Sequence, residues 1–468
     1  MSDGDAKRTD ETLIRWIEHH LGGRVVSIET FARWRMAWNI DVEVDGRIVE
    51  LHARGERELN FAIPARLADE APIHDLLEAH GLPVPHVYGI CEEIPAMVMD
   101  RIPGHVDLTF ANSDMERHDL IDQYLGLLPS IYAIGRDAIS AAGLSIPVGA
   151  EAIALDNLAV YEDVHDRLMT RPDPTAMFLR KWLRRNAPTH RETAVFITAD
   201  AFQFMFDNGR VTKLLDFELA YVGDPMMDLA SLRVRDTIKN LGDLSVIAQR
   251  FAEITGWEVD HDVVDYYAVM YNTFTVLSAG PPLQAPAPTT DYVSHLAWWV
   301  NSARWAFEVI AEIAGFELET LPLPTAVPSP RTPLHNRLFG GLRTLPVDAR
   351  HDYERRCLQQ LARHLRCLDD LMPQLVAENA ADVSALIGRR VDANDIDAAL
   401  LAFIDAASPQ HDEAIVRTLD RVVQRWHMTM APAGSLMLRH PKLRSLRPDR
   451  QTVVGPDDGW PAGAIPGT

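Results

Sequence analysis

The sequence predicts an α+β protein with two lobes, a small β-rich N-lobe and a mainly helical C-lobe, followed by an extra C-terminal helical bundle. Apolar and polar residues alternate over much of the first hundred positions, whereas apolar residues recur at helical spacing from about residue 106 onward. Five prolines at residues 321–333 then precede three further helical stripes. We expect an N-lobe over residues 1–103, a C-lobe over 104–320, a proline-rich linker over 321–340, a C-terminal helical region over 341–440 and an irregular tail over 441–468.

Composition and charge limit the possible function classes. Of the 468 residues, 47% are hydrophobic, and the three cysteines (Cys91, Cys357 and Cys367) make neither a disulfide framework nor a metal signature. The N-terminus is polar, and no apolar run approaches the roughly 18 residues of a membrane span. The formal charge of −22 argues against nucleic-acid binding; it suits a cationic substrate, but solubility explains it equally well. We expect a cytoplasmic protein with no nucleic-acid or membrane partner.

Short-range patterns predict the elements of the N-lobe. Apolar residues share one helical face over residues 11–21, and a Gly-Gly pair follows them. Asp45-Gly46 is a strong hairpin signal between two strands. The run from Arg101 to Gly104 is a plausible hinge to the next lobe. The predicted strands are 25–31, 38–44, 47–53, 87–90 and 96–99, with a second helix over 64–79.

The rest of the chain is predicted to be mainly helical. Apolar and aromatic spacing predicts helices over residues 116–135, 160–185, 262–277 and 292–313, and a rigid proline-bounded loop over 280–288. Beyond the linker, three apolar stripes predict a helical bundle that docks on the larger body, over residues 358–372, 396–404 and 415–430.

Residues 194–233 carry the candidate chemistry. They predict a strand, a loop with Asp200, a hairpin at Asn208-Gly209, and Asp216 before a helix opened by Asp224-Pro225. Two carboxylates sixteen positions apart, at the ends of strands joined by one hairpin, can converge on one spot. Phosphoryl transfer needs one carboxylate to orient and deprotonate a hydroxyl, and another to hold the Mg²⁺ beside the nucleotide phosphates. The alternative is a pair of hairpin-end acids in solvent.

Over about two thirds of the chain, from Leu13 to Ile313, the order of elements resembles the aminoglycoside phosphotransferase-like branch of the protein-kinase-like fold. The most specific part is Asp216-Phe217-Glu218, with Gly223-Asp224-Pro225 and Asp228-Leu229-Ala230 after it. The run from Val98 to Gly104 looks like the hinge of that family. The resemblance implies a two-lobed kinase-like fold, and Mg²⁺ and ATP (or GTP) as cofactors. The C-terminal helical region is then an addition in a divergent member.

The resemblance also implies roles for individual residues. Asp200 matches the catalytic-loop aspartate that accepts the proton of the attacking hydroxyl, and Asp216 matches the carboxylate that binds Mg²⁺. Asp228 would brace the catalytic loop, although an acid in the first turn of a helix is also favoured by the helix dipole. Thr198, where the family usually has histidine, and Glu218 of the metal motif would support the site.

Two departures from the family pattern concern the catalytic loop. The family has a metal-binding asparagine five residues after the catalytic aspartate, whereas here the fifth residue is Met205. The loop looks two residues shorter, and Gln203 is the polar side chain that falls into register. A glutamine carbonyl can bind Mg²⁺, and its extra methylene either offsets the shorter loop or misses the metal. We therefore keep Gln203 as a candidate metal or phosphate ligand.

The nucleotide-binding half departs further from the family. The phosphate loop is replaced by Arg33-Trp34-Arg35-Met36-Ala37-Trp38-Asn39, in which arginines such as Arg35 could contact phosphate or the tryptophans could fill the lobe core. No lysine lies between Arg8 and Arg180, so Arg54 takes the position of the phosphate-binding lysine. Its expected ion-pair partner is Glu70, with a plain surface pair as the alternative. Met99, within residues 96–100, would lie at the adenine edge.

The acceptor side is predicted least well. It should lie among Asp200, the loop over 280–288 and the aromatic helix over 292–313. On that helix, the tryptophans and His295 are expected to be structural. Arg233 and Arg235 are expected to pair with nearby acids such as Asp228 and Asp236 rather than bind substrate.

Two functions remain open. The first is an enzyme that transfers the terminal phosphate of ATP or GTP to a hydroxyl of a small molecule. The second is a catalytically weakened relative that keeps the fold as a nucleotide- or metabolite-binding, regulatory module. The altered phosphate loop and the missing lysine and asparagine favour the second, whereas retention of Asp200, Asp216 and a polar Gln203 favours the first. The sequence predicts neither the acceptor nor the oligomeric state.

Overall fold

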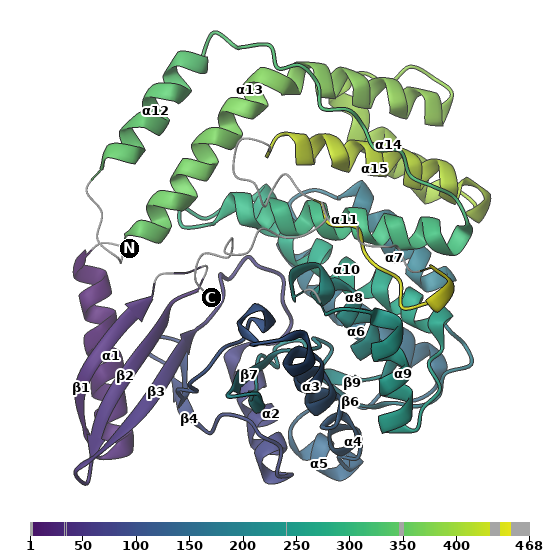
Figure 1. The fold of residues 1–468 in the computed structure, drawn as a ribbon. Coiled ribbons are helices and arrows are strands. Elements are labelled where there is room, and N and C mark those ends of the chain that lie inside the picture. The colour runs from purple at the N-terminus through teal and green to yellow at the C-terminus, as the bar shows by residue number, and fades with distance from the viewer. Residues whose placement is uncertain are drawn as a thin grey trace.

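The N-lobe is a five-stranded antiparallel sheet beside a larger helical body (Figure 1). The computed structural model describes residues 3–31, 33, 35–239, 241–345, 351–430 and 440–450. In the turn between the second and third strands, Asp45 and Gly46 both have positive φ (49° and 75°), as the two-residue hairpin signal predicted. The strand order is β1-β2-β3-β5-β4, with β1 at Arg24–Phe31, β2 at Ala37–Val44, β3 at Arg47–Gly55, β4 at Val87–Cys91 and β5 at Ala96–Asp100.

Two helices cover opposite faces of this sheet. Helix α1 (Asp3–Leu21) packs Leu13 against the face that carries Val98. Helix α2 (Leu67–Ala79) packs Leu67 against Met97 and Met99, which alternate with Val98 along β5. Because side chains alternate across a strand, odd-numbered and even-numbered positions of β5 face different helices. The same alternation directs Arg54 of β3, which follows the α1-facing Ala53, toward the α2 face.

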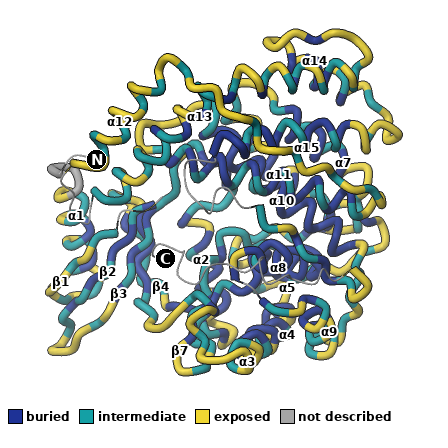
Figure 2. Tube along the Cα trace, turned by 45° about the horizontal axis from the view of Figure 1, so that its top comes forward, coloured by how far each residue is buried: buried dark blue, intermediate teal, exposed yellow. Residues whose placement is uncertain are grey.

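The C-lobe surrounds two long central helices, α10 (His261–Gln284) and α11 (Tyr292–Ala314), which are buried over most of their length (Figure 2). Two short antiparallel pairs, β6 with β9 and β7 with β8, carry the loops of residues 194–223. The other helices are α3 (Asp114–Leu125), α4 (Leu128–Tyr132), α5 (Arg136–Ala141), α6 (Ala150–Leu168), α7 (Pro174–Arg185), α8 (Met226–Lys239) and α9 (Leu244–Thr255), and the strands are β6 (Val195–Ile197), β7 (Phe204–Asp207), β8 (Arg210–Leu214) and β9 (Tyr221–Gly223).

The proline-bounded loop expected over residues 280–288 begins later than predicted, because α10 continues through Pro281 and Pro282. Proline has no N–H, so these two residues leave the carbonyls four positions earlier without their helical partners. Both carbonyls find other donors: Leu277 O accepts from His165 Nδ1 at 2.8 Å, and Ser278 O accepts from the Ala62 N–H at 3.1 Å. The helix therefore tolerates both prolines.

Residues 56–66, between β3 and α2, connect the two lobes through bonds between Ala62 and Ser278. The Ser278 hydroxyl donates to Ala62 O at 2.8 Å, so Ala62 and Ser278 bond in both directions. Phe61 packs against Trp298 and His295 of α11. His295 is buried and its Nδ1 lies 2.9 Å from Asp291 O, which agrees with the structural role expected for it. This bridge fixes the N-lobe against the end of α10.

The C-terminal region packs three helices on the body, and a fourth helix begins within the residues expected to be linker. Residues 332–344 form helix α12 (Thr332–Thr344). The helix tolerates Pro333, since this residue lies in the first turn, where a missing N–H costs nothing. The tail does pack: Leu443 and Leu446 are buried, while residues 451–468 lie outside the described part of the chain. The remaining helices are α13 (Asp352–Ile387), α14 (Ile396–Ala406) and α15 (Asp412–Met428).

The apolar stripe expected over residues 358–372 is displaced along helix α13. Leu358 and Leu365 are 39% and 40% exposed, whereas Cys367, Leu371 and Leu375 of α13 are buried. No helix in the described residues is long and apolar enough to cross a bilayer. The two-lobed α+β arrangement with added C-terminal helices is confirmed, while the residue boundaries of the parts remain a prediction.

Asp173, the N-cap of α7, should make stability depend on pH. It accepts the Thr175 N–H at 2.8 Å and Trp299 Nε1 at 3.1 Å, and burial raises its pKa to about 6. The folded state therefore favours protonated Asp173, so this residue lowers stability as pH rises from about 4 to about 6. We expect Asp173→Asn, which still caps the helix, to flatten that dependence and to gain on the order of 1 kcal/mol at neutral pH, after loss of one hydrogen bond.

Urea unfolding across this pH range measures the effect. Asp243→Asn is the matched control, because Asp243 caps α9 and its hydrogen bond with Ser245 lowers the pKa of that carboxyl. The Asp243 variant should show no such gain. A pH dependence in Asp173→Asn that runs parallel to the wild type would contradict this account.

Candidate active site

The loop that carries Asp200 is held in place by α8. Asp228 accepts the Ala199 N–H at 2.7 Å and the Thr198 hydroxyl at 3.1 Å, while its second oxygen accepts the Tyr132 hydroxyl at 2.8 Å. Burial raises the pKa of Asp228 to about 6 despite these donors. Ala199 and Phe202, on either side of Asp200, have positive φ (53° and 61°), a conformation unfavourable for residues with a side chain. The contact expected between Asp228 and the loop is therefore present.

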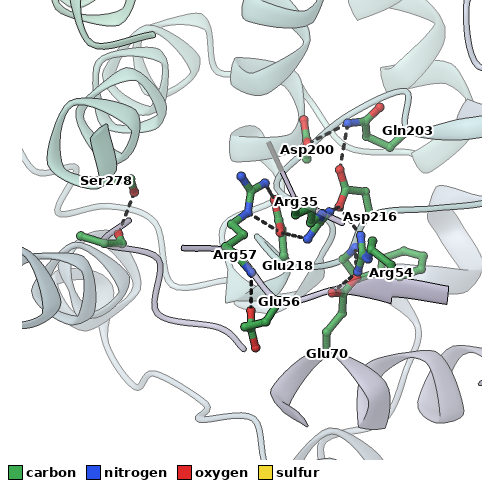
Figure 3. A network of polar contacts seen from close by, with 12 residues as sticks. Arg35, Arg54, Glu56, Arg57, Glu70, Asp200, Gln203, Asp216, Glu218 and Ser278 are labelled. Carbon is green, nitrogen blue, oxygen red and sulfur yellow. Dashed lines mark hydrogen bonds and ion pairs between the residues drawn. The ribbon is translucent and has the colours of Figure 1, made fainter. Parts of the chain in front are cut away.

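Asp200 and Asp216 converge, as the hairpin geometry predicted, and Gln203 lies beside both (Figure 3). Gln203 Nε2 donates to Asp200 Oδ2 at 3.1 Å and to Asp216 Oδ2 at 3.4 Å. Asp216 follows β8 and has a positive φ of 64°, which turns its side chain back toward the loop. Burial and the nearby Glu218 raise the pKa of Asp216. The two aspartates are not solvent-exposed hairpin acids, since Asp200 is 4% exposed and the Asp216 side chain is 26% exposed.

Arg54 and Glu70 form the predicted pair, and they also contact residues 216–217. Arg54 forms an ion pair with Glu70 and donates from Nη1 to Asp216 Oδ1 at 2.8 Å. Glu70 is 1% exposed and accepts the Phe217 N–H at 3.1 Å with its other oxygen. Although burial opposes ionisation, Arg54 holds the pKa of Glu70 well below its usual range. The pair is thus buried between β3, α2 and residues 216–218.

Glu218 is held by two further arginines. Arg57 forms a bidentate pair with it, with Nε donating at 2.9 Å, and Arg35 Nη1 donates to it at 3.2 Å. Arg35 Nη2 also lies 3.5 Å from Asp216 Oδ1. Burial opposes ionisation of Glu218, but Arg57 and Arg35 bring its pKa to about 2. Three arginines of the N-lobe thus bond carboxylates of the C-lobe (Figure 3).

In the segment that replaces the phosphate loop, a tryptophan fills the lobe core, while the phosphate contact considered for Arg35 stays a prediction. Arg35 faces the carboxylates, whereas Trp38 is buried in the N-lobe core and donates from Nε1 to Asp10 at 2.9 Å. Trp34 lies outside the described residues. Met99 packs with Leu67 on the α2 face of the sheet, the same face as Arg54.

Comparison with known proteins agrees with this geometry. Residues 57–262, from the second half of the N-lobe to the start of α10, match the model of the phosphotransferase enzyme family. We call residues 57–262 the phosphotransferase region after this match. The match includes Glu70, Asp200, Gln203, Asp216 and Glu218 and leaves the C-terminal helices outside. The kinase-like fold expected from the sequence is confirmed. The C-terminal helices are an addition to that fold.

Solved structures similar to this chain are also phosphotransferases by description. A candidate aminoglycoside phosphotransferase of Ralstonia eutropha JMP134 is 16% identical, covers 65% of this chain and 98% of its own, with a TM-score of 0.49. A macrolide 2′-phosphotransferase of Brachybacterium faecium is 19% identical; the alignment covers 59% of this chain and 93% of that one, with a TM-score of 0.40. A thermostable mutant of aminoglycoside phosphotransferase APH(4)-Ia is 18% identical; the alignment covers 64% of this chain and 99% of that one, with a TM-score of 0.44. No curated protein sequence matches the chain.

The phosphotransferase region differs from expectation at Arg233 and Arg235. Arg235 does not pair with Asp228 or Asp236: its Nε and Nη2 donate to the two oxygens of Asp200. Both expected partners are already engaged, Asp228 with the catalytic loop and Asp236 with Arg444. Arg233 is fully buried and bonds two other acids, Asp265 at 2.6 Å and Glu312 at 2.8 Å.

Three side chains that contact Asp200, Asp228 or Glu218 were missed by the sequence interpretation. They are Tyr271, which donates to Asp200 Oδ1 at 3.1 Å, Tyr132, which donates to Asp228, and Arg57, which pairs with Glu218. Tyr271 offered a signal, because a tyrosine within an apolar helix needs a partner for its hydroxyl when it is buried. Arg57 offered a weaker one, three positions after Arg54.

Among the described residues, no group of three or more His, Cys, Asp or Glu side chains could hold a metal ion by itself. Asp216 is the most accessible of the four site carboxylates, with 26% of its side chain exposed. Gln203 is the neighbouring amide.

Proposed function

We propose that this chain is a phosphotransferase that transfers the terminal phosphate of ATP or GTP to a hydroxyl of a small molecule, with Asp200 as base and Asp216 as magnesium ligand. One observation carries the proposal: the carboxylates of Asp200 and Asp216 meet on the same amide nitrogen of Gln203, at 3.1 and 3.4 Å. Two carboxylates this close suit a reaction in which one takes a proton and the other holds a cation beside phosphate. The family match supports this class of reaction.

The residues present fit a magnesium ion. Gln203 Nε2 stands between two carboxylate oxygens, a position that also suits a cation. Nitrogen and oxygen of an amide are assigned from hydrogen bonds, and a half-turn of the amide would present Oε1 beside Asp216 instead. Carboxylate and amide oxygens are ligands that Mg²⁺ accepts, with phosphate oxygens and water as the rest of its shell. Bound there, the ion would neutralise charge that develops on the phosphates.

The side chains of this protein then act as follows. Arg54 and Arg35, which now bond Asp216, would turn to the phosphates of the nucleotide, because guanidinium groups bind phosphate oxygens in the same bidentate way. Met99 would border the adenine. Asp200 would orient the hydroxyl and accept its proton as the hydroxyl oxygen bonds to the terminal phosphorus. The bond from that phosphorus to the bridging oxygen breaks, and a nucleoside diphosphate leaves. Thr198, Asp228 and Glu218 would hold these groups in place.

A second candidate is favoured by one observation. Asp200 receives donors from Arg235, Tyr271 and Gln203 on both of its oxygens. A base in this state has no free position for a substrate hydroxyl. A chain that never releases Asp200 would be the catalytically weakened, nucleotide-binding module that the sequence left open.

Nucleotide binding is the first test. We expect ATP or GTP at millimolar concentration with Mg²⁺ to raise the thermal unfolding midpoint, because a ligand at 100 times its Kd stabilises the folded state by about 2.7 kcal/mol. In Asp216→Asn, the part of the shift that depends on Mg²⁺ should vanish. Asp207→Asn, on the exposed hairpin, is the matched control and should behave as the wild type. Removal of Mg²⁺ with a chelator should reproduce the effect of Asp216→Asn.

The absence of any shift with either nucleotide would reject both candidates. A shift without nucleoside diphosphate release in the presence of hydroxyl compounds would favour the binding module. A shift together with release favours the enzyme. We place the reaction in the cytoplasm, where the three free cysteines stay reduced.

A further inference from the structure

The base predicted for the reaction has every acceptor position filled. Oδ1 of Asp200 accepts from Arg235 Nε and the Tyr271 hydroxyl, and Oδ2 accepts from Arg235 Nη2 and Gln203 Nε2. An ionised carboxylate offers about four lone-pair positions, two on each oxygen. Four donors therefore use all of them. A substrate hydroxyl can bond Asp200 only after one donor has left.

Arg235 is the donor best able to leave. Tyr271 is 6% exposed and lies on the buried helix α10, which fixes its hydroxyl. Gln203 also bonds Asp216 and belongs to the short catalytic loop. The Arg235 side chain is 21% exposed and reaches Asp200 on a long flexible stem from α8. Among the described residues, none bonds its Nη1, so this nitrogen can receive a further acceptor.

We propose that Arg235 binds an anionic group of the acceptor, a carboxylate or phosphate close to the hydroxyl that is phosphorylated. This inference rests on the proposed function, since it assigns the acceptor class of the same site. An acceptor anion replaces Asp200 as the partner of Arg235, so one charge-assisted pair is exchanged for another. Arg235 then frees two positions on Asp200, one on each oxygen, and one of them takes the hydroxyl. The hydroxyl proton passes to Asp200 as the oxygen–phosphorus bond forms, the bond from phosphorus to the bridging oxygen breaks, and the nucleoside diphosphate leaves.

The same geometry disfavours other acceptors. A neutral acceptor would have to break the pair between Arg235 and Asp200 without offering a replacement, and such charge-assisted bonds are about twice as strong as neutral ones. A cationic acceptor would also meet the charge of Arg235 and of Lys239, one turn further along α8. Lys239 is 9% exposed and bonds the Phe202 carbonyl of the catalytic loop. The strongly negative total charge of the chain therefore does not describe the surroundings of Arg235 and Lys239.

Three acceptors that share a vicinal diol test the proposal: glycerate, glycerol and 3-amino-1,2-propanediol, which are anionic, neutral and cationic. With ATP and Mg²⁺, we expect the kcat/KM of the full chain to be at least about 10-fold higher for glycerate than for the other two, the factor that 1.4 kcal/mol represents. As a readout besides activity, glycerate alone should raise the thermal unfolding midpoint, and the other two should not.

Variants locate the preference at Arg235. Arg235→Gln should lose both the glycerate preference and the glycerate-dependent midpoint shift, mainly through KM, and Arg235→Lys should restore part of each. Arg167→Gln removes an exposed arginine whose ion-pair partner among the described residues is the exposed Asp163, and this variant should keep both. The wild-type series remains decisive if a variant fails to fold.

Equal responses of the wild type to the three acceptors, including no response to any, would overturn the proposal, as would a preference that Arg235→Gln retains. Failure of the proposed function looks different, because then neither nucleotide shifts the unfolding midpoint. A chain that binds nucleotide with Mg²⁺ and prefers glycerol or the amine would keep the proposed function and reject only the anionic acceptor.

Discussion

Asp200→Asn is expected to reduce kcat by about 100- to 10,000-fold, the usual contribution of a positioned general base. Asparagine has nearly the same shape and can still accept hydrogen bonds from Arg235 and Tyr271 through its remaining oxygen, but it cannot take the proton of a hydroxyl. Nucleotide binding should change little, because the predicted phosphate contacts come from Arg54 and Arg35. Release of nucleoside diphosphate with glycerate as acceptor measures the rate, and the thermal shift with ATP and Mg²⁺ measures binding.

The control for this experiment is Asp207→Asn, which changes an exposed aspartate of the hairpin after the catalytic loop and should retain the wild-type rate. A rate in Asp200→Asn within a factor of a few of the wild type would show that another group takes the proton. A parallel loss of nucleotide binding would instead indicate that the substitution disturbs the loop held by Asp228.

Glu70→Gln is expected to lower the free energy of unfolding by about 3 kcal/mol, the lower end of the range for breaking a buried ion pair. Glu70 is 1% exposed, pairs with Arg54 and accepts the Phe217 N–H at 3.1 Å. Glutamine can keep the bond to Phe217, but it leaves the guanidinium of Arg54 with Asp216 as its remaining anionic partner. Urea unfolding measures the loss, and weaker nucleotide binding should accompany it.

Glu78→Gln provides the matched substitution on the same helix. Glu78 is 46% exposed and pairs with His86 at the surface, so its replacement should cost at most about 1 kcal/mol. The low pKa of Glu70 adds a pH test, because its stabilisation is present above the pKa of an unfolded glutamate, about 4.3, and is lost as pH falls below that value. Equal losses in the two variants would mean that the buried pair adds nothing to stability.

Local rules predicted the parts of the site that depend on strands and hairpins. Asn208-Gly209 specifies a two-residue turn, and both residues have the positive φ that this turn requires (47° and 72°). The turn sets the distance between the ends of β7 and β8, and with it the approach of Asp216 to Asp200. The Arg54–Glu70 pair followed in the same way from alternation along β3 and the position of α2. The chemical roles of these residues remain predictions.

Contacts between helices could not be predicted in this way. Arg235 has acids close in sequence, Asp228 and Asp236, but it bonds Asp200, which is 35 residues away on another element. Which acid it reaches depends on how α8 is rotated in the core, and α8 is buried on nearly all sides, so its apolar pattern does not specify that rotation. The loop expected at Pro281 and Pro282 was wrong for a related reason. The donors that replace the missing proline N–H groups come from Ala62 and His165, which are distant in sequence.

The reciprocal bonds between Ala62 and Ser278 also set the order in which the molecule can assemble. They join positions 216 residues apart, so they close a very long loop, whereas the hairpins of β1, β2 and β3 close short ones. During synthesis the N-terminal part of a chain emerges first. The N-lobe sheet can then form early, but Ala62 lacks its partner Ser278 until α10 has been made. Docking of the N-lobe on the carboxylates around Asp200 is thus a late step of folding, completed by a carbonyl that Pro282 leaves without a helical donor.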